Sequence, residues 1–328
     1  MESAPKTVVV AEYVGIDISK AYFDVALPQA GKYRHLKLGN DDGGFKQLLS
    51  ELQGGVYQLV MEASGPYYMQ LACFLCKHGI AVSVVNPLVV RRFCQMRMTR
   101  AKTDKKDAVM LAQYGQSEKP ALWQPEPGYV QELKQLEMVK QGLQKTRQQH
   151  SRQLEALQEA GKGKGNKQAL KSLKKMISQA EKELENVEKQ MQLLIREHHQ
   201  QLLERLNSIP GLGKKSTMLL IVLTGGFTKF AHYKQLISYV GLSPRIYESG
   251  TSVKGKARIC KMGMSRIRAV LYVCSWSAIK CNKACKELYE RLVAKGKAKR
   301  LALIAVVNKL LKQAFAVATK DEDYAEYL

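Results

Sequence analysis

The sequence predicts an α/β domain followed by a long helical region, a fold class of α/β plus α, and three observations support it. Residues 8–120 alternate short β-branched runs with amphipathic segments, which is typical of a mixed sheet covered by helices. Residues 127–205 are polar, with leucines at regular intervals, which favours long helices. Residues 206–320 hold further amphipathic segments and most of the excess positive charge. We expect these ranges to be three domains, followed by an acidic, mobile tail at 321–328.

The first domain is expected to contain five strands and three helices. The runs over 8–18, 22–27 and 33–38 are separated by short turns, which predicts an antiparallel meander. Later strands are expected over 56–61 and 80–85. Helices are expected where turn or capping residues precede a periodic apolar segment, and they begin after Asp42, Pro66 and Thr103.

The second domain is expected to be an antiparallel helical hairpin with a coiled-coil seam. In its second half, apolar residues alternate steps of three and four, which predicts an a/d seam of nearly four heptads. These residues are Leu170, Leu173, Ile177, Ala180, Leu184, Val187, Met191 and Leu194. A flexible, basic break at 161–167 separates the two helices, and the seam could equally pair between subunits.

The charge balance indicates a polyanionic partner. The chain has 52 Lys and Arg against 29 Asp and Glu, a net charge of +23, so nucleic acid is the expected ligand. A membrane is not expected, because no apolar run approaches the roughly 20 residues of a spanning helix. The N-terminus also lacks the features of a signal peptide, and the seven cysteines are typical of reduced thiols. We therefore expect a cytoplasmic protein.

Four acids are candidate metal ligands. Asp17 lies near the end of the first strand and Glu62 at the end of the fourth, where open α/β sheets place their ligands. Asp104 and Asp107 leave one face of the last helix at its first turn. Oxygen-only ligands suit Mg²⁺ or Mn²⁺, which would assist attack on a phosphodiester. The alternative is that they are turn and cap acids, with Thr103 as the helix N-cap.

The basic segment contains a turn that is similar to the hairpin of helix-hairpin-helix motifs. Its sequence, Ile-Pro-Gly211-Leu-Gly213-Lys-Lys, would expose backbone N–H groups at a helix N-terminus, where a DNA phosphate can dock. Between 206 and 320 there are 22 basic and only three acidic residues. The expected nucleic-acid-binding residues are Gly211, Gly213, Lys214, Lys215, Lys254, Lys256, Arg258, Lys261, Arg266 and Arg268.

A hydroxyl-rich loop over 247–258 lies inside this segment. A serine there could be a nucleophile assisted by the neighbouring cations, or the loop could bind phosphate without a covalent step. The physics of the sequence favours the phosphate-binding loop. Spacing alone does not select Ser249 over Tyr247, Thr251 or Ser252.

Five motifs in order resemble a known family over nearly the whole chain. They are Gly-Ile-Asp17-Ile-Ser-Lys, Glu62-Ala-Ser-Gly, Lys-Thr-Asp104-Lys-Lys-Asp107-Ala, Ile-Pro-Gly-Leu-Gly and Tyr-Glu-Ser249-Gly-Thr-Ser-Val. This pattern resembles the DEDD transposases of the insertion-sequence 110 family and their Piv-type DNA invertase relatives.

The resemblance implies a fold, a site and a reaction. The first domain would be RuvC/ribonuclease-H-like, with Asp17, Glu62, Asp104 and Asp107 binding Mg²⁺, and Ser249 would be the nucleophile of a mostly helical transposase domain. Dimers that pair into tetramers would recombine donor and target DNA through a Holliday-junction-like intermediate, guided by a non-coding RNA.

We therefore expect the transposase of a bacterial mobile element, associated with the nucleoid. The alternatives are a Piv-like invertase, a RuvC-like junction nuclease without a serine step, and a non-catalytic nucleic-acid-binding protein.

Overall fold

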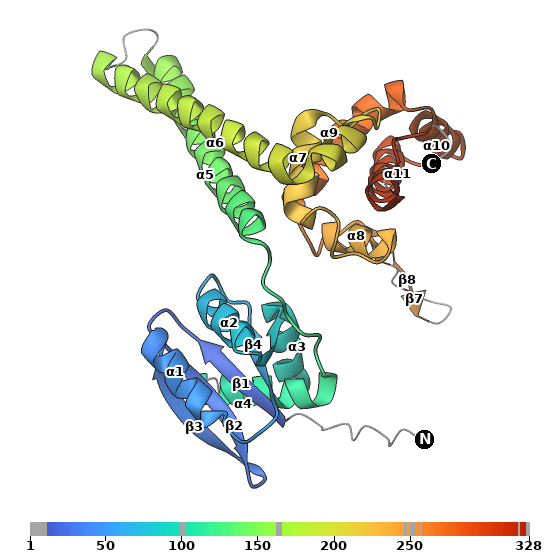
Figure 1. Cartoon of the computed structure of the whole chain (residues 1–328). Helices are drawn as coiled ribbons and strands as arrows, with labels where there is room; N and C mark the ends of the chain where they lie inside the picture. The colour runs from blue at the N-terminus through green and yellow to red at the C-terminus, as the bar shows by residue number, and fades with distance from the viewer. Residues whose placement is uncertain are drawn as a thin grey trace. The chain divides into compact units, whose positions relative to one another are not determined.

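A five-stranded mixed sheet is the centre of the first of two units in the computed structural model (Figure 1). The units comprise residues 1–126 and 127–328. The structure describes residues 12–98, 103–161, 166–245, 248–249, 253–255, 258–320 and 322–325.

The sheet has the strand order β3-β2-β1-β4-β5. Its strands are β1 (Glu12–Ile18), β2 (Tyr22–Gln29), β3 (Lys32–Gly39), β4 (Tyr57–Glu62) and β5 (Ala81–Val85). The first three strands are antiparallel, and β4 and β5 continue from β1 in parallel. The predicted mixed α/β class and the antiparallel meander are therefore confirmed.

Within residues 12–98 and 103–126, four helices accompany this sheet, one more than the sequence predicted. They are α1 (Asp42–Glu51), α2 (Tyr68–Lys77), α3 (Pro87–Met96) and α4 (Asp104–Glu118). The strand face that carries Ile16 and Phe23 packs against the side chain of Phe45 from α1 and that of Leu71 from α2. Helix α3 was not predicted, although Asn86 accepts a hydrogen bond at its N-terminus and Pro87 occupies a first-turn position.

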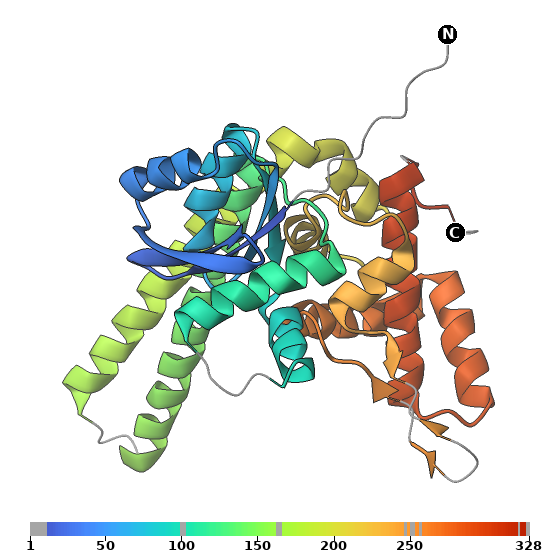
Figure 2. The ribbon, with the colours of Figure 1, turned by 90° about the horizontal axis from the view of Figure 1, so that it is seen from below.

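Helix α4 covers the other face of the sheet, and its backbone packs directly on the backbone of β1 at Gly15 (Figure 2). A Cβ atom on Gly15 would overlap the carbonyl oxygen of Ala108, and it would lie 2.5 Å from the amide nitrogen of Ala112. Farther along α4, Gly115 packs against the ring of Tyr13. Later helix residues thus meet earlier strand residues, so α4 runs antiparallel to β1, and its first turn lies at the end of β1.

This close contact makes Gly15 sensitive to substitution. We expect Gly15→Ala to destabilise the first unit by about 3 kcal/mol, because the added methyl group meets backbone rather than a movable side chain. Chemical denaturation followed by circular dichroism measures the change. Gly142→Ala is the control, since Gly142 is exposed within a helix with open space around it, and the same methyl should stabilise by about 0.5–1 kcal/mol there. Equal stability of Gly15→Ala and wild type would contradict the packing argument.

The second unit begins with two long helices packed side by side (Figures 1 and 2). These are α5 (Gly128–Gly161) and α6 (Lys167–Asn207). Lys140 pairs with Glu188 and Arg147 with Glu181, so residue numbers rise along one helix and fall along the other. The two helices are therefore antiparallel. The predicted seam is buried from Ala180 to Met191 and half-buried at its earlier positions.

The remaining helices form the core of the second unit together with α5 and α6. They are α7 (Lys214–Thr224), α8 (Tyr233–Val240), α9 (Ser265–Cys281), α10 (Lys283–Ala294) and α11 (Lys299–Lys320). Short strand pairs lie between α8 and α9, and they are β6 (Pro244–Arg245) with β9 (Arg258–Ile259) and β7 (Glu248–Ser249) with β8 (Val253–Lys254).

Helix α11 is long and apolar, and the segment after it returns to the second unit. By length and composition α11 could cross a membrane, but it buries Val306, Leu310 and Ala314 in the core of the second unit, as a core helix does. In the segment predicted to be an acidic, mobile tail, the structure describes residues 322–325, and Tyr324 makes polar contacts there. Its amide donates to the Ser208 hydroxyl at 3.0 Å, and its phenol oxygen lies 3.3 Å from the side-chain oxygen of Asn282.

Candidate active site

Strand pairing places three acids on one face of the sheet. Asp17 on β1 lies directly opposite Asp24 on β2. On the other side of β1, Ile16 lies beside Met61 of the parallel strand β4. Asp17 follows Ile16 and Glu62 follows Met61, so the two acids lie at matching positions on neighbouring strands. Because side chains alternate along a strand, Asp17, Asp24 and Glu62 share the face opposite to that of Ile16. That is the face covered by α4.

The first turn of α4 supplies two further acids. Thr103 is its N-cap, with its hydroxyl accepting a hydrogen bond from the amide of Lys106 at 3.3 Å, so the capping prediction is confirmed. Asp104 and Asp107 follow in the first turn, the former exposed and the latter half-buried. Acidic side chains at this position interact favourably with the helix dipole.

The pKa of Asp17 records how closely these acids converge. It is raised from 3.8 to about 6, first by burial and then by the negative charges of Asp107, Asp104, Glu62 and Asp24. The four acids singled out in the sequence, which come from β1, β4 and α4, are therefore near enough for their charges to act on one carboxylate.

The chemistry of this cluster suits a hard divalent cation. Every donor is a carboxylate oxygen, and a cation would relieve the repulsion that, after burial, raises the pKa of Asp17. Among the described residues, however, no three His, Cys, Asp or Glu side chains are arranged closely enough to hold an ion. The donor types fit Mg²⁺ or Mn²⁺, and the carboxylates would need to move closer together to ligate one.

Asp24 was not predicted as a site residue. The residue lies inside the apolar strand Tyr22–Leu27 and is only 4% exposed. An acid inside an apolar strand is costly unless it has a role. The same argument that selected Asp17 would have selected Asp24, had it been applied to the second strand.

The raised pKa of Asp17 predicts a pH dependence of stability in the cation-free protein. Between pH 3.8 and about 6 the folded state holds a proton that the unfolded state has released, so the free energy of unfolding should fall as pH rises through this range. Urea midpoints in EDTA should therefore fall more steeply between pH 4.5 and 7 for wild type than for Asp17→Asn. Parallel curves for the two proteins would contradict this assignment.

Ser249 lies on a short hairpin of the second unit. Its backbone belongs to β7, opposite Val253 of β8. Its side chain and that of Lys254 lie outside what the structure describes, as do the whole residues Tyr247, Thr251, Ser252 and Lys256. Arg258 follows on β9 and is exposed.

The glycine-rich turn predicted between α6 and α7 is present. Gly211 has φ +101°, and a Cβ there would lie 2.6 Å from the Cβ of Ala278, so the turn packs closely on α9. Gly213 is the N-cap of α7, and its N–H donates to the Ser216 hydroxyl at 2.9 Å. One of the N–H groups predicted to face phosphate is thus already used, while Lys214 is exposed beside it.

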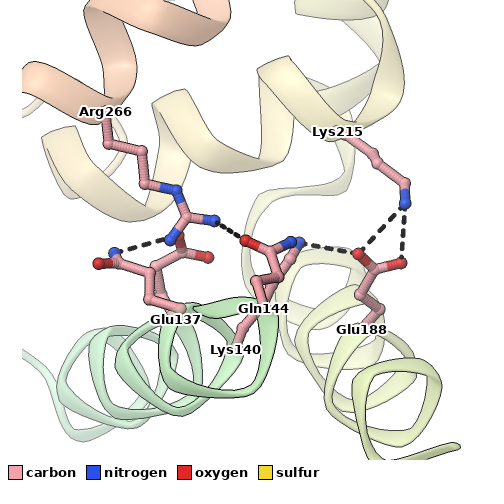
Figure 3. Close-up of polar contacts among 7 residues, drawn as sticks. Glu137, Lys140, Gln144, Glu188, Lys215 and Arg266 are labelled. Carbon is pink, nitrogen blue, oxygen red and sulfur yellow. Dashed lines mark hydrogen bonds and ion pairs between the residues drawn. The ribbon is translucent and has the colours of Figure 1, made fainter. Parts of the chain in front are cut away.

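Lys215 takes part in a network of ion pairs that links α7 to helices α5 and α6 (Figure 3). Its ammonium lies 3.3 Å from a carboxylate oxygen of Glu188, and the same carboxylate binds Lys140 at 3.1 Å. Lys140 is 8% exposed, whereas the side chain of Lys215 is 80% exposed. The two cations together lower the pKa of Glu188, against the opposing effect of its burial. Lys215 is therefore paired within the unit and accessible to solvent.

Arg266 and Arg268 are bound to protein groups. One guanidinium nitrogen of Arg266 lies 2.8 Å from the carboxylate of Glu137, which is 3% exposed, and another donates to Gln144 at 3.1 Å (Figure 3). Arg268 donates to the carbonyl of Val240 at 2.8 Å. Both arginines are half-buried, and these contacts hold α9 against α5 and α8.

Lys261 is the remaining cation of the predicted set. It is exposed, and its φ of +59° places it in the left-handed region. Its amide donates to the carbonyl of Gly241 at 3.0 Å, which fixes the turn that carries it.

Comparison with known proteins identifies the class of protein. Residues 14–160 match the IS110 DEDD transposase family, described as Transposase, and residues 203–290 match a family described as Transposase IS116/IS110/IS902 family. A pilin gene-inverting protein of Moraxella bovis is 32% identical over 326 residues, covering 95% of this chain and 97% of its own length.

Two further relatives agree with this class. The pilin gene-inverting protein of Moraxella lacunata is 31% identical over 328 residues, with the same shares covered. A 43.6 kDa protein of insertion element IS110 from Streptomyces coelicolor is 29% identical over 112 residues, covering 34% of this chain and 27% of its own length. The family matches and the pilin gene-inverting relatives place this chain among the DNA recombinase and transposase enzymes. The chain belongs to the IS110 transposase family and its pilin gene-inverting relatives.

Proposed function

We propose that the enzyme cleaves and exchanges DNA strands with a divalent cation held by Asp17, Glu62, Asp104 and Asp107, and with Ser249 as nucleophile. The observation that carries the proposal is that strand pairing and α4 bring these four acids to one face of the sheet, where their charges add to the effect of burial in raising the pKa of Asp17. The first unit would be a RuvC/ribonuclease-H-like domain, since its strand order and its family match are consistent with that fold.

The two units would contribute different parts of the reaction. When bound, Mg²⁺ or Mn²⁺ would polarise the phosphodiester and stabilise the leaving oxygen. The Ser249 oxygen would attack phosphorus and form a phosphoserine ester, while one DNA hydroxyl leaves with a proton. A second DNA hydroxyl would then attack that ester, rejoin the strand and return the proton to serine. The exposed Lys214, Lys261 and Arg258 would bind DNA phosphates.

Whether the substrate is an element or an invertible segment is a separate question. Transposition is the first candidate, because both family matches are to transposases. A second candidate is site-specific inversion. One observation favours it: the two relatives that this chain matches over 97% of their length are pilin gene-inverting proteins. Action in the bacterial cytoplasm at the nucleoid, and assembly of dimers into tetramers, are part of both candidates. A RuvC-like junction nuclease would need no serine step.

Substitution of Ser249 tests the covalent step. We expect Ser249→Ala to lower recombination and the covalent protein–DNA adduct by about 10³-fold or more, because the nucleophile is removed. DNA affinity should stay unchanged, since one hydroxyl and no charge is lost. The substrate is a plasmid carrying the gene with its native flanking DNA, and the adduct is detected after denaturation.

Ser252→Ala is the matched control, because it removes a hydroxyl from the same loop. Adduct formation should persist in this control. Recombination by Ser249→Ala at the rate of wild type would exclude Ser249 as nucleophile, and would favour hydrolysis by water.

RNA guidance is tested by the nucleic acid that the enzyme carries. We expect enzyme purified from its native host at low salt to retain a single discrete RNA encoded beside its gene, because guided members of the family delegate base recognition to RNA. Sequencing of the bound RNA measures this, and sequencing at high salt controls for loose electrostatic binding. Random RNA, or none, would contradict guidance and favour an unguided invertase or a nuclease.

A further inference from the structure

Asp24 is a buried carboxylate that the proposed reaction does not use. It is 4% exposed and lies directly opposite Asp17 across the antiparallel pair of β1 and β2. Cβ atoms of directly opposite residues in such a pair lie about 4.5–5.5 Å apart. Like charges in this position destabilise a sheet, so the pair needs a compensating interaction.

The described part of the first unit does not supply that interaction. Lys37 on β3 lies opposite Asp24 on its other side, but its ammonium sits 3.6 Å from the centre of the Tyr22 ring. Over residues 12–98 and 103–126, no hydrogen bond or ion pair holds the carboxylate of Asp24.

Asp24 also faces the acidic cluster. It shares a sheet face with Asp17 and Glu62, and α4, which carries Asp104 and Asp107, packs against β2 as well as β1. Its charge is among the charges that, after burial, raise the pKa of Asp17. A buried, unpartnered carboxylate thus points into the place where the four other carboxylates meet.

We propose that Asp24 is a fifth carboxylate of the divalent-cation site, and that Asp17 and Asp24 ligate one cation between them. The inference rests on the proposed cation-dependent reaction. Two carboxylates on adjacent strands would approach the ion from one side and leave its other positions to water and a DNA phosphate, as Mg²⁺ sites commonly do. The cation would supply the positive charge that Asp24 lacks among the described residues.

Titration of full-length, nucleic-acid-free enzyme with Mn²⁺ tests this assignment. Isothermal titration calorimetry gives the affinity and the number of bound ions. The electron paramagnetic resonance signal of free Mn²⁺ checks both values. We expect Asp24→Asn to weaken Mn²⁺ binding at least tenfold or to remove one bound ion. Asp42→Asn is the control, because Asp42 is exposed on α1, which packs on the opposite face of the sheet.

The outcomes separate this inference from the function on which it rests. Wild-type binding by Asp24→Asn, together with lost binding by Asp17→Asn, would overturn the role of Asp24 and leave the four-acid site standing. Failure of wild type itself to bind Mn²⁺ would overturn both.

The melting temperature in EDTA is a second readout, and the proposal predicts the direction of its change. We expect Asp24→Asn to raise the melting temperature, because it removes a negative charge facing Asp17, and to reduce the rise that Mn²⁺ produces in wild type. If Asp24 only stabilised the fold, Asp24→Asn would lower the melting temperature in EDTA and leave the rise produced by Mn²⁺ unchanged. Asp24→Ser is smaller and also uncharged, so it repeats both measurements if the amide does not fit. Lower melting temperatures in both variants would overturn the proposal.

Discussion

The close contact of α4 with β1 is the constraint on which the acidic site depends. Gly15 has no Cβ, so the backbone of α4 at Ala108 and Ala112 can approach the strand directly. Because the helix runs antiparallel to the strand, its first turn reaches the end of β1, where Asp17 lies. The acids repel one another and cannot hold this arrangement themselves. Packing on a glycine keeps them together, and the pKa of Asp17 is raised there, first by burial and then by the neighbouring negative charges.

In the second unit, charge serves the fold as well as the ligand. Glu137 is 3% exposed and pairs with Arg266, and Lys140 is 8% exposed and pairs with Glu188. Buried ion pairs of this kind contribute little net stability, because desolvation offsets the attraction. They do restrict which helix faces can meet, and here they set α5 and α6 against α7 and α9 (Figure 3). The count of basic residues therefore overstates the number of cations that are available for phosphate.

Local signals predicted most of the first unit, and non-local ones explain the failures. Thr103 was found because capping depends on neighbouring residues alone. Helix α3 was missed because Asn86-Pro87 was used only as the end of the preceding strand, whereas the same two residues also begin a helix. Asp24 becomes informative only once pairing places it opposite Asp17. Ser249 was selected by resemblance, since spacing gives every hydroxyl of its loop equal weight.

Electrostatics separates DNA binding from DNA cleavage in the proposed reaction. The acidic face of the first unit repels a phosphate, and Asp17 ionises only at a cost, so a cation must be present before a phosphodiester can approach these carboxylates. The second unit holds exposed cations and needs no metal to attract DNA. In the proposed reaction, DNA would therefore be captured without being cut. Cleavage would follow only once the cation site is complete.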